Sequence, residues 1–379
     1  STFYTRKTKS DYDGSATDEK GYVSNNKMYA FQSRFDHQTK NSDGSLIFHY
    51  HNYDREYDNA SYLDEYESES LVTKVEKSLK LNNKISFGFG SEYKYDWGAF
   101  ENRGSYTAST KGHMKNLGIF GNAGYNISNS QTLSLYVRSD DHNTTGRNQT
   151  YKLNYNQFFG QFKFGATHST GLRNPSLYEL YGSDNYGIKG NTNLNPEKSE
   201  TNEIYVEFNF SDSIKLSSTV YRSKVFDRIE SNSAYTKHEN ELIDINQEGL
   251  ENELSINKNN QTISFYTNFS KSRKANGQAQ SRRPDLSYGL NLSQNINSRN
   301  YGNMNLILNY KHTGKYDDYN GSKNTMQKST DLIDLSINKN WFGSIISINL
   351  TNLLNERYEK PATYSQDGRK LKIGLTRKY

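Results

Sequence analysis

The sequence predicts an all-β fold, a transmembrane antiparallel β-barrel, on three observations. Apolar and polar residues alternate with a period of two through most of the chain, as in strands that present one apolar and one polar face. Short and long polar connectors alternate between these segments, as they do between the two rims of an outer-membrane barrel. No apolar run approaches the roughly 18–20 residues of a membrane helix, so the sequence does not indicate a helical membrane protein.

The alternation defines 18 segments, each bounded by polar turn residues. In residues 285–293, for example, Leu286, Tyr288, Leu290 and Leu292 share one face, while Ser, Gly and Asn occupy the other. The predicted strands, in order, are residues 1–8, 27–37, 44–53, 70–80, 85–96, 114–125, 132–139, 148–157, 161–169, 199–209, 214–231, 241–257, 262–271, 284–296, 301–312, 328–340, 343–352 and 370–379.

The connectors between these strands separate into two classes. Short ones include residues 81–84, 126–131, 210–213 and 258–261. Long ones are residues 9–26, 54–69, 97–113, 170–198, 232–240, 272–283, 313–327 and 353–369. A soluble β-sandwich would also alternate along its strands, but it needs a dry core between its sheets. Here the polar face carries Lys, Glu, Asn and Gln, which favours a wet lumen.

Composition supports the same class. Only 32% of the 379 residues are hydrophobic, yet 13% are aromatic, with 31 Tyr and 18 Phe, which fits aromatic girdles at the membrane interfaces as well as ordinary strand propensity. The absence of Cys excludes a disulfide scaffold. The net charge of +5 arises from interleaved basic and acidic residues, so no nucleic-acid partner is expected.

The last predicted strand orients the barrel. Leu371, Ile373, Leu375 and Tyr379 share one parity in "KLKIGLTRKY", so the strand ends on an outward aromatic residue. Such a strand is expected to finish in the periplasm, which places the long connectors, including residues 170–198, outside the cell.

Three stretches resemble motifs of the TonB-dependent outer-membrane receptors, and they follow the order of that family. In "GLRNPSLYELYG" and "GNTNLNPEKSE" the matching residues are Pro175, Leu177, Tyr178, Leu180, Tyr181, Gly182, Gly190, Asn191, Leu194, Pro196 and Glu197. A second match is "INQEGLENELSI", residues 245–256. The C-terminal match is carried by Asn352, Leu353, Tyr358, Gly368, Arg369 and Tyr379. Within the family, "RSDD" at residues 138–141 resembles the cobalamin transporters.

The resemblance implies that residues 1–379 are one barrel domain, the C-terminal portion of a receptor. About 18 of roughly 22 strands would be present, and the plug domain would be absent. It implies a monomer in the outer membrane of a Gram-negative bacterium, in contact with lipid. Extracellular loops would bind a scarce organometallic nutrient, with cobalamin the first choice. A missing plug would connect the barrel to the TonB complex for active import.

Calcium is the one cofactor that the resemblance suggests. Receptors of this type bind Ca²⁺ on acidic early extracellular loops, and hard cations prefer clustered carboxylate oxygens. The candidate ligands are Asp11, Asp13, Tyr57 and Asp58, in "KSDYDGSATDEK" and "YDREYDNASYLDEY". An acidic, solvated loop is the simpler interpretation of both stretches.

No catalytic residues are predicted, because the sequence holds neither a Gly-x-Ser-x-Gly motif nor a phosphate-binding loop. A transporter rather than an enzyme is therefore expected. The alternatives are a ferric-siderophore receptor of the same fold, a passive porin, and a soluble β-rich adhesin or lectin.

Overall fold

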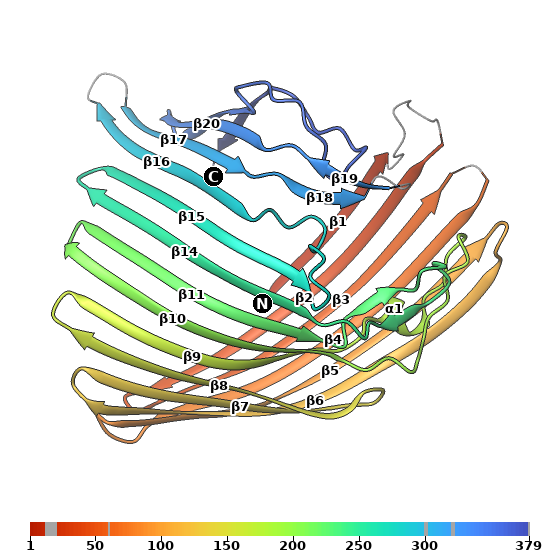
Figure 1. The fold of residues 1–379 in the computed structure, drawn as a ribbon, viewed down its shortest axis with the longest axis horizontal. Helices are drawn as coiled ribbons and strands as arrows, with labels where there is room; N and C mark the ends of the chain where they lie inside the picture. Colours follow the sequence, from red (N-terminus) through yellow and green to blue (C-terminus); the bar gives the residue numbers. More distant parts are fainter. Residues whose placement is uncertain (12–20, 60, 299–301, 320–322, 378–379) are drawn as a thin grey trace. The chain divides into compact units, whose positions relative to one another are not determined.

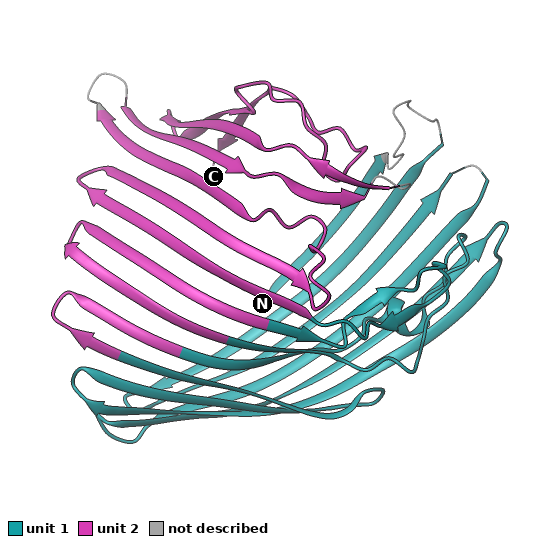
Figure 2. Cartoon of the chain, in the orientation of Figure 1, with its two compact units in different colours: residues 1–156, 167–201, 224–244 teal, residues 157–166, 202–223, 245–379 magenta. Residues whose placement is uncertain are grey.

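The computed structural model describes residues 1–11, 21–59, 61–298, 302–319 and 323–377. Within them the chain is nearly all strand, and 18 strands belong to one hydrogen-bonded sheet. The chain divides into two compact units, shown in Figure 2. Unit 1 comprises residues 1–156, 167–201 and 224–244, and unit 2 comprises residues 157–166, 202–223 and 245–379.

Unit 1 is built from long antiparallel hairpins and one short helix (Figure 1). Its elements are β1 (Thr2–Asp11), β2 (Val23–Thr39), β3 (Ser42–Asp58), β4 (Leu63–Lys80), β5 (Ile85–Arg103), β6 (Ala108–Ser128), β7 (Gln131–His142), α1 (Leu177–Tyr181), β12 (Ile229–Ser231) and β13 (His238–Asn240). Strands β1 to β7 pair in chain order, each antiparallel to the next.

Four strands are divided between the units: β8 (Gly146–Phe159), β9 (Phe162–Arg173), β10 (Glu197–Ser211) and β11 (Ile214–Phe226). The rest of unit 2 consists of β14 (Ile245–Lys258), β15 (Gln261–Lys274), β16 (Leu286–Ser298), β17 (Gly302–Thr313), β18 (Tyr316–Tyr319), β19 (Asn324–Gln327), β20 (Thr330–Trp341), β21 (Ser344–Thr351) and β22 (Lys370–Arg377). In this unit β17 pairs with β20, while β18 and β19 form a separate hairpin.

The observed register confirms the predicted faces. Leu292 lies opposite Leu308, and Leu290 lies opposite Tyr310, so apolar residues of neighbouring strands share one side of the sheet. That side is exposed: Phe3 is 68% and Ile373 71% accessible. Large apolar side chains of the described strands are thus accessible to their surroundings. No helix in the described part of the chain is long and apolar enough to span a membrane.

Residues 313–327, predicted as a long connector, contain the β18–β19 hairpin, and two further predicted long connectors are wrong. Residues 54–69 and 97–113 are mostly strand, because β3 and β4 are joined by residues 59–62 and β5 and β6 by residues 104–107. The hydrophobic pattern ends where the predicted strands end, but ladder hydrogen bonds continue through polar residues on both faces. Apolar periodicity therefore marks only part of each strand.

Candidate functional site

The segment between β9 and β10, residues 174–196, lies within unit 1 and is called the cap segment. Its helix α1 contacts β5 and β6. A capping box begins this helix: the Ser176 hydroxyl accepts from the Glu179 backbone N–H, and the Glu179 carboxylate accepts from the Ser176 N–H. Both bonds satisfy N–H groups that a helix start leaves open. The predicted motif here is thus a folded turn rather than an irregular loop.

Apolar residues of the motif anchor the cap segment. Leu180 is 1% and Leu194 3% exposed, and both pack with Ile229, Met114 and Tyr181. The backbone of Gly190 also packs closely against the backbone of Leu180. A Cβ atom on residue 190 would lie 2.4 Å from the Leu180 carbonyl oxygen. A larger residue at this position would force the two chain segments apart.

A charged cluster ties both ends of the cap segment together. Arg173 donates to the Glu197 carboxylate at 2.7 Å and to Glu179 at 3.0 Å. Glu197 also accepts from the Ile229 backbone N–H at 2.8 Å. Burial raises the pKa of both carboxyls, but these hydrogen bonds outweigh burial and hold each pKa below its ordinary value. Both glutamates therefore remain anionic and paired at neutral pH.

Buried polar residues fix the tip of the cap segment to the hairpins. The Asn102 amide donates to Asp64 at 2.7 Å and to the Ser183 carbonyl at 3.1 Å, and the Asn185 amide also donates to Asp64. Asp64 and Asn102 are 4% and 1% exposed. Sequence reasoning missed both residues, because their partners are distant along the chain. Asn102 is 81 residues from Ser183, and Asp64 is 121 residues from Asn185.

Aromatic residues complete this region. The Tyr178 ring lies edge-on to Tyr66, Phe100 and His238, with centroid separations of 5.8–6.0 Å. The Tyr62 and Tyr186 hydroxyls are hydrogen-bonded to each other, and Tyr186 is 70% exposed. The cap segment thus presents aromatic surface from a fixed base.

The four candidate calcium ligands lie on the hairpin ends or beyond the described residues. Asp11 ends β1 and pairs with Val23, which in turn pairs with Asp58 at the end of β3. Tyr57 lies edge-on to Tyr66, and Asp13 is outside the described residues. Among the described residues no three His, Asp or Glu side chains are arranged to hold a metal ion. Calcium binding stays a prediction.

A pocket of about 420 Å³ in unit 1 is lined by the start of β2, the end of β3, the start of β4 and the end of β5, and is called the acidic pocket. Its charged lining is Asp54, Glu56, Glu65, Glu67 and Glu101 with Lys27, Arg55 and Arg103. Arg103 pairs with Glu65 at 2.6 Å and with Glu101 at 3.3 Å. Asn25 donates to Glu56 at 2.7 Å. Glu65 and Glu101 are therefore paired with a cation, and Glu56 accepts a hydrogen bond from a neutral amide.

The "RSDD" residues divide between the two faces of β7. Arg138 bridges Asp140 at 2.7 Å and Glu92 at 2.9 Å, and Asn116 donates to Asp140. Ser139 and Asp141 have the opposite parity.

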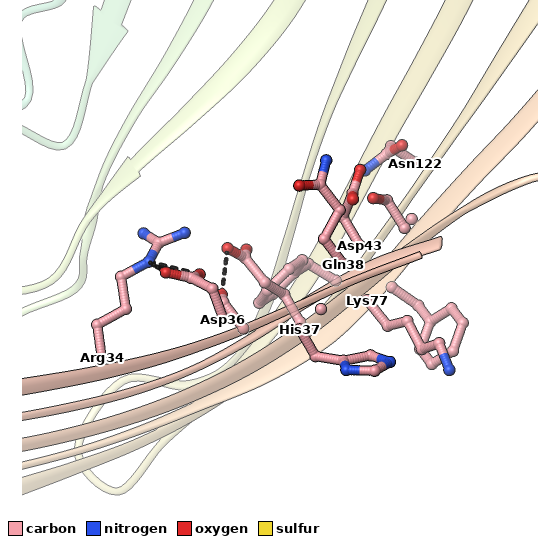
Figure 3. Close-up of a pocket in the computed structure, with 14 residues that line it drawn as sticks. Arg34, Asp36, His37, Gln38, Asp43, Lys77 and Asn122 are labelled. Carbon is pink, nitrogen blue, oxygen red and sulfur yellow. Dashed lines mark hydrogen bonds and ion pairs between the residues drawn. The ribbon is translucent and has the colours of Figure 1, made fainter. Parts of the chain in front are cut away.

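A pocket of about 580 Å³ lies toward the other end of β2 to β6 (Figure 3), where Arg34 pairs with Asp36 at 2.8 Å. The polar face of unit 1 thus carries internally paired charges.

The C-terminal motif also has a structural role, in unit 2. The Asn352 amide donates to the Glu356 and Asp367 carbonyls, and its own backbone N–H donates to Asp334. Arg369 donates to the Leu353 carbonyl at 2.9 Å. These bonds tie together the two ends of residues 352–369. Leu371, Ile373 and Leu375 are exposed as predicted, and Tyr379 lies outside the described residues.

Known proteins share this fold. The family model described as TonB dependent receptor-like, beta-barrel, matches residues 1–353. The siderophore receptor PirA from Acinetobacter baumannii superposes with a TM-score of 0.76 over 94% of this chain and 62% of that one, at 15% identity. The ferric-catecholate import receptor Fiu from E. coli K12 has a TM-score of 0.76 over 94% of this chain and 64% of that one, at 12% identity.

A relative by sequence is the vitamin B12 transporter BtuB of Vibrio cholerae serotype O1, 26% identical over 239 residues. The match covers 61% of this chain and 37% of BtuB, so it spans little more than a third of that relative's length. The family match covers most of the chain and agrees with the antiparallel sheet. The chain belongs to the TonB-dependent receptor-like β-barrel family.

Proposed function

We propose that this chain is the barrel portion of an outer-membrane receptor that binds cobalamin at its extracellular loops for TonB-energised import. The observation that carries the proposal is the cap segment, a folded platform held by apolar, charged and polar anchors. Rigid sheets that position loops are the usual architecture of recognition sites. The relationship to a vitamin B12 transporter supports cobalamin as the ligand.

The remaining parts of the proposal follow from family membership. The apolar outward face fits lipid contact in the outer membrane of a Gram-negative bacterium. A plug would couple the receptor, as a monomer, to the TonB complex, and Ca²⁺ at the early extracellular loops would order the ligand site. Substrate passes unchanged through such a receptor, so its role is transport rather than catalysis.

Ligand binding tests the substrate. Full-length receptor in detergent should bind cyanocobalamin, and chelation of Ca²⁺ should weaken that binding. A ferric catecholate siderophore serves as the competing ligand. Saturable binding of the siderophore with none of cyanocobalamin would overturn the substrate assignment and leave a siderophore receptor of the same fold.

A further inference from the structure

Two histidines of β3, His49 and His51, lie side by side in unit 1 and are called the histidine pair. Residues two apart in a strand point to the same side of the sheet. The two rings have a centroid separation of 5.4 Å and are tilted by 40° to each other. Leu46 and Phe48 have the opposite parity and are exposed on the apolar face. The histidine pair therefore belongs to the polar face of β3.

Two buried polar atoms at the histidine pair have no hydrogen-bond partner among the described residues. They are Nδ1 of His51 and Oγ of Ser70, and the two residues lie directly opposite each other in the β3–β4 ladder. Ser70 is only 5% exposed. Buried polar atoms are rarely left unpaired in proteins, and an ion or a water molecule commonly accounts for those that are. The two atoms thus indicate a small polar ligand between β3 and β4.

The surroundings of the histidine pair can accept a cation. Ala30 of β2 and Ser70 of β4 are the residues opposite His51, so both cross-strand neighbours have short side chains. Asp96 of β5 is opposite Ser70 on the same face, and its carboxylate pairs with Lys94 at 2.9 Å. Because the charge of Lys94 is offset by Asp96, it does not repel a metal ion strongly.

Two imidazoles at this spacing can chelate one transition-metal ion. Zinc binds imidazole nitrogen at about 2.0–2.1 Å, so two nitrogens that share a tetrahedral ion lie roughly 3.3 Å apart. Rings whose centroids are 5.4 Å apart reach this separation when their nitrogens turn toward each other. The described residues provide no group of three His, Asp or Glu side chains for a metal ion. Water would therefore complete the coordination, and the Ser70 hydroxyl can hydrogen-bond to such a water.

We propose that the histidine pair binds a divalent transition-metal ion, Cu²⁺, Ni²⁺ or Zn²⁺, with His49 and His51 as its protein ligands. Imidazole suits all three ions, and Cu²⁺ is bound most tightly in the general order of affinities. Ca²⁺ prefers oxygen ligands, so this site is distinct from the calcium site predicted on the early extracellular loops. The inference goes beyond the proposed function, because it requires neither cobalamin nor TonB.

Calorimetric titration of the full-length receptor in detergent, purified without a polyhistidine tag, provides the test. CuCl₂, NiCl₂ and ZnCl₂ are titrated separately. We expect all three metals to bind, Cu²⁺ most tightly, and an excess of Ca²⁺ to leave Zn²⁺ binding unchanged. The electron paramagnetic resonance spectrum of bound Cu²⁺ should show splitting from coordinated imidazole nitrogens.

Substitutions localise the binding. His49→Gln and His51→Gln should each weaken Zn²⁺ binding at least about tenfold, because each removes one of the two protein ligands. Ser70→Ala keeps both ligands and should weaken binding about fivefold, the fold-change expected from one hydrogen bond. His37→Gln is the matched control, since His37 is an exposed histidine of β2 and its substitution leaves the histidine pair intact.

Three results would overturn the proposal: no binding of any of the three metals, an unchanged affinity and copper spectrum in both variants of the histidine pair, or an equal loss with His37→Gln. Displacement of Zn²⁺ by Ca²⁺ would also contradict it, because the ion would then be held by oxygen ligands. Circular dichroism confirms that each variant retains its strands. Because the titration contains no cobalamin, its failure is distinguishable from failure of the proposed function, which shows in cyanocobalamin binding and uptake.

Discussion

The acidic pocket of unit 1 has a volume of about 420 Å³. A pocket of about 400 Å³ in unit 2, here called the basic pocket, has a charged lining of Lys311, Lys328, Arg357, Lys360, Glu356 and Glu359. The two have similar volumes but different charge pairing. In the acidic pocket Arg103 bridges two glutamates. In the basic pocket none of the cations has a carboxylate partner among the described residues. Among the described residues, two of the five carboxylates of the acidic pocket have an ion-pair partner. The two pockets thus differ in the extent of charge pairing as well as in the sign of their charge.

The largest effect is expected where the scaffold depends on burial. Leu180→Ala removes a side chain that is 1% exposed and should destabilise the folded cap segment by about 3 kcal/mol. Hydrogen exchange of residues 174–196 should accelerate accordingly. Leu242→Ala, at a residue that is 100% exposed, should leave exchange unchanged. Equal exchange in the two variants would show that the cap segment is not anchored by this side chain.

A smaller effect is expected at the paired charges of the scaffold. Arg173→Ala leaves Glu179 and Glu197 without their shared cation, but Arg173 is 44% exposed and solvent screens the loss. We expect a destabilisation of the cap segment of about 1–2 kcal/mol, measured by hydrogen exchange. Arg147→Ala is the control, since its side chain is 72% exposed and 3.9 Å from Asp141. No difference between the two would mean that the pairing does not stabilise the scaffold.

The same pairs should make the cap segment sensitive to acid. Because the folded-state pKa of Glu179 and Glu197 lies below the ordinary value of 4.5, their stabilisation is fully present above pH 4.5. It is lost as the pH falls through the lower folded-state pKa values. Hydrogen exchange of residues 174–196 is measured between pH 6 and pH 3 and corrected for the intrinsic exchange rate at each pH; limited proteolysis is an alternative. Protection of the segment should fall only at the acidic end of this range. Loosening that begins above pH 5 would contradict this assignment.

The smallest effect on stability is expected in the acidic pocket. A substitution there also tests whether charge pairing controls the binding of ions. Arg103 is 61% exposed, so Arg103→Gln should change the free energy of unfolding by no more than about 0.5 kcal/mol. The substitution leaves Glu65 and Glu101 without this cation, and Ca²⁺ affinity should rise about threefold. Arg147→Gln should leave Ca²⁺ affinity unchanged. An unaltered affinity in both variants would show that pairing does not control ion binding there.

The sequence alone predicted the faces of the strands and most turns, because alternation is a local property. Leu371, Ile373 and Leu375 are exposed on one face as expected. The end of β3 and the start of β4 were missed, since Glu56 and Glu65 face each other in a ladder that no apolar pattern marks. The β18–β19 hairpin was missed for the same reason.

The candidate site was less predictable. The motif residues Leu180, Leu194 and Gly190 were identified, but their role as anchors appears only when Ile229 lies beside them. Asp64 and Asp318 carry no signal in sequence, because each acts through partners that folding brings together. The basic pocket likewise combines lysines from separate segments.

Uptake of radiolabelled cyanocobalamin by cells tests the proposed function most directly. Cells that lack their own transporter would carry the full-length receptor with or without a functional TonB complex, and the Leu180→Ala and Leu242→Ala variants would be compared. We predict saturable uptake that requires TonB, falls with Leu180→Ala and persists with Leu242→Ala. Uptake that is equal with and without TonB would contradict an active receptor and indicate a passive pore.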